Sequence, residues 1–303
     1  EQTVATMMAF EQLCFEDRPD MVVVVGDVNA TVACSLVAAK LQIPVAHVEA
    51  GLRSGDRRMP EEINRILTDQ LSDLLFTTSR DAGSNLEREG IEPAKIHFTG
   101  NVMVDSLMKN LQQLDCAAVS ARVLGTEQIG RPYGVLTLHR PSNVDQPELL
   151  EGWIDAFESI AKRLPLICPL HPRTGKQLEA FGMEARFSKA VTVIPPLGYL
   201  DFIALMQGAK LVITDSGGLQ EETTVLGVPC LTIRENTERP VTIHHGTNQL
   251  VGLSPERLTI LANQVLDSGH SEYGRPELWD GKAAGRIVDV LERFVESREP
   301  WVQ

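Results

Sequence analysis

The chain has few basic residues, no long apolar run and no paired cysteines. Its 28 Lys and Arg against 41 Asp and Glu give a net charge of −13 and a pI near 5.0, which argues against nucleic acid or an anionic membrane as partner. No apolar run approaches the roughly 18 residues of a membrane span, and the N-terminus has no secretory pattern. The five cysteines show no CxxC spacing, which predicts free thiols in a reducing cytoplasm. They are Cys14, Cys34, Cys116, Cys168 and Cys230.

Apolar runs alternate with amphipathic stretches along all 303 residues, a length typical of two domains. The predicted strands are Met21–Val25, Pro44–Val48, Leu74–Thr77, Ile96–Phe98, Tyr133–Leu138, Leu166–Pro169, Val191–Ile194, Leu211–Thr214 and Pro229–Ile233. The predicted helices include Ala30–Leu41, Glu61–Leu71, Leu149–Arg163, Leu200–Gly208 and Arg257–Leu266. This alternation predicts an α/β fold with parallel sheets and crossover helices, in two Rossmann-like, doubly wound domains that face each other across a cleft.

The domain boundary is predicted around Gln112–Pro132, a polar stretch with two glycines and a proline. We therefore expect an N-terminal domain over residues 1–115, a nucleotide-binding domain over 116–281, and a C-terminal helix in 282–303 that packs back on the first domain. The chain opens on a helix, Gln2–Phe15, where a doubly wound domain normally opens on a strand. We expect that the first domain lacks its N-terminal strands and that about 60 residues precede residue 1.

The most informative motif is DSGGLQEE at residues 215–222, directly after an apolar strand and at the start of a helix. Free backbone N–H groups at a helix N-terminus favour an anion such as phosphate, and Gly217 and Gly218 allow close approach beside Ser216. The carboxylates one turn further suit hydroxyl groups, as on a ribose. The motif predicts a nucleotide site; the alternative is an ordinary helix start with acidic residues near it.

Three carboxylates occur at strand ends or helix starts in the first half. Asp27 follows the first strand, Glu49 and then Arg53 end the second within HVEAGLR, and Glu61 begins a helix. His47 lies two residues before Glu49, so both are expected on one strand face. A glutamate in an apolar strand suits a base of raised pKa. Each has a structural alternative: a helix cap, a salt bridge between Glu49 and Arg53, and a favourable helix dipole.

Histidine and arginine recur together at strand ends of the second half. These residues are His139, Arg140, His171 and Arg173, with Arg239 following a later strand. Arginine suits a diphosphate because its fork donates in pairs. Zinc is the competing interpretation of the histidines, including His244 and His245, but no pair has HExxH or CxxC spacing. We expect no metal.

Taken together, these motifs resemble those of the non-hydrolysing UDP-N-acetylglucosamine 2-epimerases. The matching segments run in order from about Val22 to Gly252 and comprise GD at 26–27, HVEAGLR at 47–53, PEExNR at 60–65, TGN at 99–101, HR at 139–140, DSGGxQEE at 215–222 and TERP at 237–240. The resemblance implies the glycosyltransferase-B architecture, a UDP-sugar substrate and no NAD or other cofactor. It also implies a cytoplasmic enzyme that is commonly a homodimer.

The activity implied is reversible epimerisation at carbon 2 of UDP-N-acetylglucosamine, giving UDP-N-acetylmannosamine. UDP is eliminated to leave a 2-acetamidoglucal and is then added back. By motif position, the family's acid/base residues match Asp27, Glu49, Glu61 and His139. Its substrate contacts match Ser216, Gly217 and Gly218 for the diphosphate, Glu222 for the ribose and Arg239 for a further phosphate contact. Arg53, Arg140, His171 and Arg173 are additional candidates for UDP-sugar binding.

Other functions remain open from the sequence alone. The nucleotide motif also fits a glycosyltransferase on the same scaffold, although three carboxylates exceed what transfer needs. A hydrolysing epimerase that releases free sugar is a close variant. The third alternative is an inactive nucleotide-binding fragment, because the family's opening strand with Gly-Thr-Arg-Pro-Glu is not in this chain.

Overall fold

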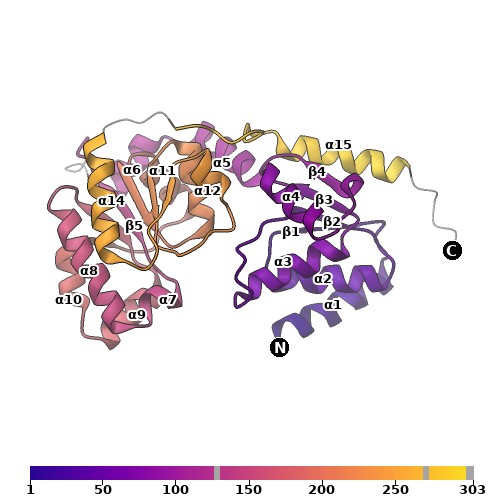
Figure 1. Ribbon diagram of the computed structural model, residues 1–303, viewed down its shortest axis with the longest axis horizontal. Coiled ribbons are helices and arrows are strands. Elements are labelled where there is room, and N and C mark those ends of the chain that lie inside the picture. The colour runs from indigo at the N-terminus through magenta and orange to yellow at the C-terminus, as the bar shows by residue number, and fades with distance from the viewer. Residues whose placement is uncertain (126–129, 269–272, 298–303) are drawn as a thin grey trace. The chain divides into compact units, whose positions relative to one another are not determined.

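The computed structural model describes residues 1–125, 130–268 and 273–297, and its chain divides into two compact units (Figure 1). Unit 1 comprises Glu1–Ser106 together with the chain from Pro276 onward, and unit 2 comprises Leu107–Arg275. The division falls inside helix α5 (Val102–Gln113), upstream of the predicted boundary. Residues 298–303 of the predicted C-terminal segment lie outside the described residues. No helix in the described ranges is long and apolar enough to cross a membrane.

Unit 1 contains a four-stranded parallel sheet in the order β1-β2-β3-β4. The strands are β1 (Val22–Val25), β2 (Val45–Ala50), β3 (Leu74–Thr77) and β4 (Ile96–Phe98). The helices are α1 (Gln2–Glu16), α2 (Asn29–Lys40), α3 (Pro60–Leu71), α4 (Arg80–Arg88) and α15 (Ala283–Glu296), with a short 3-10 helix over Pro93–Lys95. Parallel strands need crossover connections, which these helices provide.

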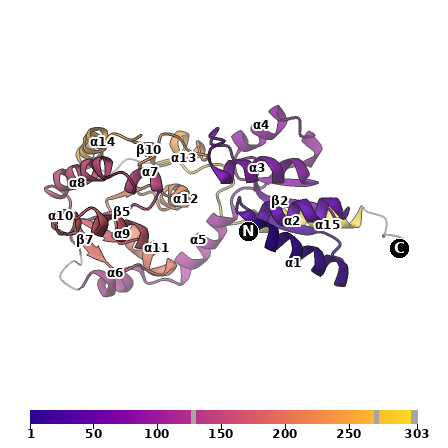
Figure 2. The same cartoon turned by 90° about the horizontal axis from the view of Figure 1, so that it is seen from below.

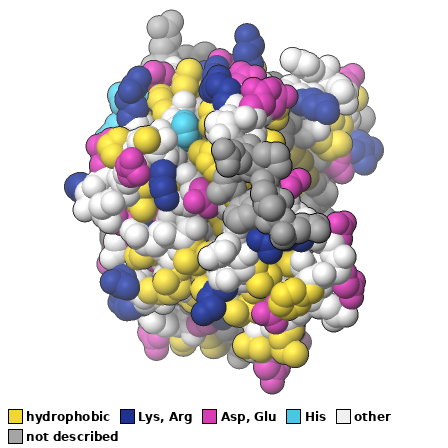
Figure 3. All heavy atoms as spheres, turned by 90° about the vertical axis from the view of Figure 1, so that its right-hand side faces the viewer, with side chains coloured by type: hydrophobic (Ala, Val, Ile, Leu, Met, Phe, Trp, Pro, Cys, Tyr) yellow, Lys and Arg dark blue, Asp and Glu magenta, His cyan; other side chains and the backbone are white. Residues whose placement is uncertain are grey.

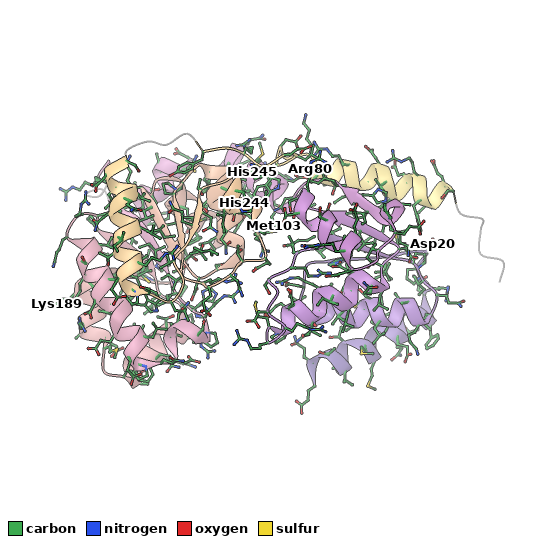
Figure 4. The ribbon with its side chains drawn as sticks, in the orientation of Figure 1. Asp20, Arg80, Met103, Lys189, His244 and His245 are labelled. Carbon is green, nitrogen blue, oxygen red and sulfur yellow. The ribbon has the colours of Figure 1, made fainter. Side chains whose placement is uncertain are left out.

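Helices cover both faces of the unit 1 sheet. On one face α1 and α2 pack on β1 around a core that includes Cys14, Val24 and Val45. On the other, Ile287 of α15 joins a cluster with Phe76. The connection to α15 is held by the Trp279 indole, which donates to Thr78 O at 2.9 Å, and by an ion pair of Arg80, labelled in Figure 4, with Glu277. The C-terminal helix therefore belongs to the first unit.

Several apolar side chains of unit 1 remain exposed. They are Val4, Met8, Leu13 and Phe15 of α1 and Val23 and Val25 of β1. Figure 3 shows yellow side chains across the lower part of the face that it presents, the end of the molecule at which Figure 1 draws α1.

Unit 2 contains a six-stranded parallel sheet in the order β10-β9-β8-β5-β6-β7. The strands are β5 (Gly134–Thr137), β6 (Leu166–Pro169), β7 (Thr192–Ile194), β8 (Leu211–Thr214), β9 (Cys230–Thr232) and β10 (Asn248–Leu250). Every predicted strand is present: four have the predicted bounds, and the other five differ by one or two residues at one or both ends. The strand β10 was not predicted. The reversal of strand order at β5 and β8 is the arrangement at which doubly wound folds bind ligands, beyond the carboxyl ends of the strands.

The helices of unit 2 lie on both faces of its sheet (Figure 2). One face carries α8 (Pro147–Ala161), α10 (Glu184–Ala190) and α14 (Pro255–Ser268), whose apolar residues form the main core around Trp153 and Phe157. The other carries α6 (Cys116–Leu124), α11 (Tyr199–Gln207) and α12 (Gly217–Leu226). The shorter α7 (Pro141–Val144), α9 (Pro172–Ala180) and α13 (Val241–His244) follow strand ends. Helix α6 occupies part of the stretch that was predicted as a linker.

Candidate functional site

In unit 1, Asp27 follows the end of β1, and Glu49 is the last residue but one of the neighbouring strand β2. Gly26 has a φ of 68°, and a Cβ placed on it would lie 3.5 Å from Glu49 Oε2, so the Glu49 carboxylate lies beside the residue that precedes Asp27. Glu49 itself has a φ of 72°, and the register of β2 against β3 shifts there. A non-glycine residue in the left-handed region is strained and is commonly found at functional sites.

This bulge corrects the expectation that His47 and Glu49 project from one regular strand face. His47 is fully buried, and its Nδ1 lies 2.6 Å from Asp69 Oδ1 while its Nε2 lies 2.9 Å from Gly26 O. The histidine therefore ties β2 to α3 and to the end of β1. It supports the carboxylates and is enclosed by the fold.

Arg65 of α3 holds Asp27 in place. Its Nε and Nη2 lie 2.9 and 2.7 Å from Asp27 Oδ2, and its Nη1 lies 2.6 Å from Glu62 Oε2. Burial would raise the Glu62 pKa, but backbone N–H groups of Ser54 and Gly55 and the Arg65 guanidinium outweigh it, so this pKa lies below its ordinary value. Glu62 is thus an ionised structural partner of Arg65.

The remaining unit 1 candidates differ in exposure. Glu61, on the first turn of α3, is exposed and forms no ion pair or hydrogen bond with the described residues. Arg53 is instead committed to two carboxylates: its Nη2 lies 2.7 Å from Asp69 Oδ2 and 2.6 Å from Glu89 Oε2. Through these two acids, Arg53 links the segment that follows β2 to α3 and to the end of α4.

In unit 2, the motif at 215–222 turns from β8 into α12, as predicted. Ser216 is the N-cap, and Gly217 and Gly218 are the first helical residues. The two glycines differ in surroundings: a Cβ on Gly217 would lie 2.6 Å from Glu238 Oε1, whereas a Cβ on Gly218 would meet nothing within 4 Å. Gly217 is required for internal packing, and Gly218 leaves the helix N-terminus open for an anion.

His139 and Arg140 follow β5, and the neighbouring β8 supplies Asp215, to which both are bonded. His139 Nδ1 lies 2.8 Å from Asp215 Oδ1, and Arg140 Nε donates to Asp215 O at 2.9 Å. The His171 ring lies with its centroid 5.2 Å from that of His139, so the structure brings these two predicted residues together. Arg173, by contrast, is exposed and pairs with Asp145 at 2.5 Å.

Deeper in α12, two adjacent glutamates have different environments. Glu222 is 7% exposed, and burial raises its pKa although the Tyr199 hydroxyl, its hydrogen-bond partner, acts in the opposite direction. Burial and then the Glu222 charge raise the pKa of Tyr199 to about 12, so that hydroxyl remains a donor. Glu221 instead forms an ion pair with Arg239, in which its Oε1 lies 3.0 Å from Nε.

Arg239 belongs to a buried ion-pair cluster beside Gly217. It contacts Glu238 as well as Glu221, and Glu238 Oε2 lies 2.8 Å from Arg234 Nη2. Two guanidinium and two carboxylate groups balance within this cluster, which fixes the 234–240 loop against the start of α12.

The family model described as UDP-N-acetylglucosamine 2-epimerase matches residues 1–292. The chain belongs to this family. A UDP-N-acetylglucosamine 2-epimerase of Methanocaldococcus jannaschii is 43% identical over 297 residues, covering 96% of this chain and 80% of the relative. A UDP-2,3-diacetamido-2,3-dideoxy-D-glucuronate 2-epimerase of Pseudomonas aeruginosa is 40% identical over 302 residues, covering 97% of this chain and 80% of the relative.

Solved structures agree with the fold. The Methanocaldococcus jannaschii UDP-GlcNAc 2-epimerase in complex with UDP-GlcNAc and UDP superposes with a TM-score of 0.86 at 42% identity, covering 96% of this chain and 81% of that one. An α,α-trehalose 6-phosphate synthase from Burkholderia multivorans, 14% identical, shares the fold alone with a TM-score of 0.59, covering 99% and 77%. Both units are Rossmann-like, in the glycosyltransferase-B-like architecture.

Three residues of this candidate site were not predicted with a role. Arg65 and Asp215 are buried beside Asp27 and His139, and Tyr199 contacts Glu222. Arg65 and Asp215 lie inside the motifs at 60–65 and 215–222, but each holds a neighbouring side chain, which the local sequence does not indicate. Tyr199 follows the strand β7 with no local pattern to distinguish it. Among the described residues, no group of three or more His, Cys, Asp or Glu side chains is arranged to hold a metal.

Proposed function

We propose that this chain interconverts UDP-N-acetylglucosamine and UDP-N-acetylmannosamine by eliminating UDP across carbons 1 and 2 and adding it back. The proposal rests on one observation in a chain of this family: the Asp27 carboxylate is held by only one of its two oxygens. Arg65 anchors its Oδ2, and its Oδ1 accepts no hydrogen bond from any described residue. A half-anchored, partly exposed carboxylate is suited to proton transfer.

Two carboxylates are needed because the proton leaves one face of carbon 2 and arrives on the other. Asp27 provides one, the strained Glu49, whose carboxylate lies beside Gly26, provides another, and Glu61 provides a third on the first turn of α3. Carbon 2 beside an acetamido group is a weak acid, so its deprotonation requires a positioned base that water does not solvate freely.

Unit 2 is proposed to bind UDP. The α12 N-terminus at Ser216–Gly218 would hold the diphosphate, where the helix dipole favours negative charge, and Glu222 would accept the ribose hydroxyls. His139, with Arg140 and His171 nearby, would stabilise the charge that gathers on the leaving diphosphate. Arg239 would act from within its ion-pair cluster, chiefly by holding the loop that supports Gly217.

Incubation with UDP-N-acetylglucosamine in deuterated water tests the function. Epimerisation predicts deuterium at carbon 2 of the recovered sugar nucleotides and formation of the manno epimer without added NAD. Free sugar together with UDP would indicate a hydrolysing epimerase. No exchange, with UDP still bound, would leave a transferase or a nucleotide-binding protein.

The second candidate substrate is UDP-2,3-diacetamido-2,3-dideoxy-D-glucuronate. The Pseudomonas aeruginosa relative that bears this name has 40% identity, close to the 43% of the Methanocaldococcus jannaschii enzyme. Both reactions invert carbon 2 beside an acetamido group, so the same carboxylates would serve. The ratio of kcat/KM for the two sugar nucleotides, measured in parallel, decides between them; we expect it to favour UDP-N-acetylglucosamine.

We also propose that the enzyme works as a homodimer in the cytoplasm, with the UDP-sugar as its ligand and neither nucleic acid nor membrane as partner. All five cysteines are free thiols, which suits a reducing compartment, and the charge of −13 disfavours polyanions. Light scattering in solution tests the dimer, and fractionation of the source cells tests the location.

A further inference from the structure

The two oxygens of the Asp215 carboxylate have separate sets of partners. Oδ2 accepts from the backbone N–H of His139 at 2.9 Å, from that of Arg140 at 2.7 Å and from Asn143 Nδ2 at 3.1 Å. Oδ1 lies 2.8 Å from His139 Nδ1, an ion-pair distance outside hydrogen-bond geometry. The side chain is fully buried at the end of β8, so a single carboxylate both closes the β5–α7 turn and faces one nitrogen of the imidazole.

This arrangement defines the state of the His139 ring. An ionised oxygen this close to a ring nitrogen repels a lone pair there, so the contact favours a proton on Nδ1 and leaves Nε2 as the nitrogen directed away from the carboxylate. Burial would raise the Asp215 pKa, but the bonds to His139 and to the backbone N–H groups outweigh it and hold this pKa below its ordinary value. Asp215 is therefore ionised at neutral pH.

His171, whose ring lies beside that of His139, does not take over the role of Asp215. The pKa of His171 is lowered, first by burial and then by the neighbouring His139. His171 is thus more readily neutral than an ordinary histidine, and it adds little repulsion to a charged His139 ring.

We propose that Asp215 is a positioning residue that fixes the tautomer and orientation of His139, so that Nε2 of a protonated ring points its N–H at the leaving diphosphate. The part of this inference that concerns the diphosphate rests on the proposed function, whereas the tautomer is a property of the free protein. Substitution of Asp215 by asparagine separates the two.

The donors around Asp215 determine how the side chain of Asp215→Asn is oriented. Because three donors converge on the Oδ2 position, the asparagine carbonyl oxygen must lie there, and the amide NH2 must face His139 Nδ1. The neutral ring then accepts at Nδ1 and carries its proton on Nε2, the reverse of the wild-type tautomer. The substitution also leaves no anion beside the ring.

Nitrogen-15 NMR of the histidine rings, with His139→Gln identifying the His139 signal, measures the tautomer directly. We expect the neutral ring to carry its proton on Nδ1 in the wild type and on Nε2 in Asp215→Asn. We expect kcat to fall on the order of 10²–10⁴-fold in Asp215→Asn, with the UDP Kd changed less than about fivefold. Asn143→Ala is the matched control, since it removes one donor to Oδ2 and leaves the His139 contact intact; its kcat should stay within about tenfold of wild type.

Three results would overturn the inference: an Nε2-protonated neutral ring in the wild type, an unchanged kcat in Asp215→Asn, or an equal loss of kcat in Asn143→Ala. The wild-type spectrum decides the tautomer even if Asp215→Asn does not fold. Failure of the proposed function looks different, because the tautomer would still reverse in Asp215→Asn while the wild type showed no deuterium at carbon 2.

Discussion

Oδ2 of Asp27 accepts two hydrogen bonds from Arg65, at 2.9 Å from Nε and 2.7 Å from Nη2. The third guanidinium nitrogen lies 2.6 Å from Glu62, which is itself held by two backbone N–H groups. The helix α3 thus carries an anchor for a carboxylate that follows a different strand. Its consequence is that one oxygen of Asp27 is fixed and the other is available.

Arg65→Met should destabilise unit 1 strongly. Arg65 is 3% exposed, and its removal leaves Glu62 buried without its cation, a loss of about 3–5 kcal/mol. Hydrogen exchange of amides in residues 1–106 measures this better than a single melting curve, because the chain has two units. Arg65→Lys should retain part of the stability but not the geometry, since an ammonium lacks the guanidinium fork. The double variant Glu62→Gln/Arg65→Met should recover part of the loss; equal protection in Arg65→Met and wild type would contradict the anchor.

At position 49, replacing glutamate by glycine should abolish turnover but relieve backbone strain. Glu49→Gln, Glu49→Ala and Glu49→Gly should all lose turnover by on the order of 10²-fold or more, because each lacks the carboxylate. The free energy of unfolding of Glu49→Gly should exceed that of Glu49→Ala by about 1 kcal/mol, because a φ of 72° is strained for any side chain. Glu49→Gly should therefore have the higher melting temperature. Calorimetry of the two variants checks the order. Equal stability, or turnover in any of the three, would count against the strained-base account.

The two glycines of α12 should respond differently to alanine. Gly217→Ala places a Cβ 2.6 Å from Glu238 Oε1 and 2.9 Å from Arg239 Nη1, so it should disrupt the ion-pair cluster and lower the melting temperature. Gly218→Ala meets open space and should stabilise the helix by up to about 1 kcal/mol. It should nevertheless weaken UDP binding, because the methyl group occupies the approach of the diphosphate. Titration calorimetry with UDP separates the cases; unaltered UDP affinity in Gly218→Ala would remove the diphosphate from this position.

Glu222→Gln should raise stability at alkaline pH and lower UDP affinity. The folded-state pKa of Glu222 is raised by burial, so its contribution to stability is present below the unfolded pKa and is lost as pH rises through the folded pKa. A glutamine cannot ionise, so the melting temperature should increase at pH 8 and change little at pH 4. UDP affinity should fall roughly 10–100-fold with the loss of a charged acceptor for the ribose.

Glu221→Gln is the matched control for this prediction. It lies beside Glu222 on the same helix but pairs with Arg239, so it should lower the melting temperature at pH 8. If the two variants shift in the same direction, burial does not govern the Glu222 carboxyl.

The alternation of short apolar runs with amphipathic stretches predicted most of this fold. Buried parallel strands such as Leu74–Thr77 are short apolar runs that lie between helices. The strand β10 was not predicted because Asn248–Leu250 is short and mostly polar. Helix α6 was taken for a linker because glycines and polar residues surround it. Both elements are recognised through their packing, which the sequence of one segment does not contain.

The candidate site could be predicted as residue types at strand ends, but not as partnerships. Nothing local distinguishes Glu61, which is exposed, from Glu62, which is buried against Arg65. The left-handed conformation of Glu49 comes from the bulge between β2 and β3, and the commitment of Arg53 to Asp69 and Glu89 comes from the packing of α3 and α4. Such contacts join residues that are distant in the sequence.

The central claim is that the Asp27 carboxylate handles the carbon 2 proton of the sugar nucleotide. Its most direct test is the rate of deuterium incorporation at carbon 2 in Asp27→Asn, measured with the UDP Kd of the same preparation. Asp56→Asn, which alters an acid paired with Arg58 in the β2–α3 loop, is the control. The account predicts exchange reduced on the order of 10²–10⁴-fold in Asp27→Asn alone, with the UDP Kd within about threefold of wild type. Exchange at the wild-type rate, or a matching loss of UDP affinity, would contradict it.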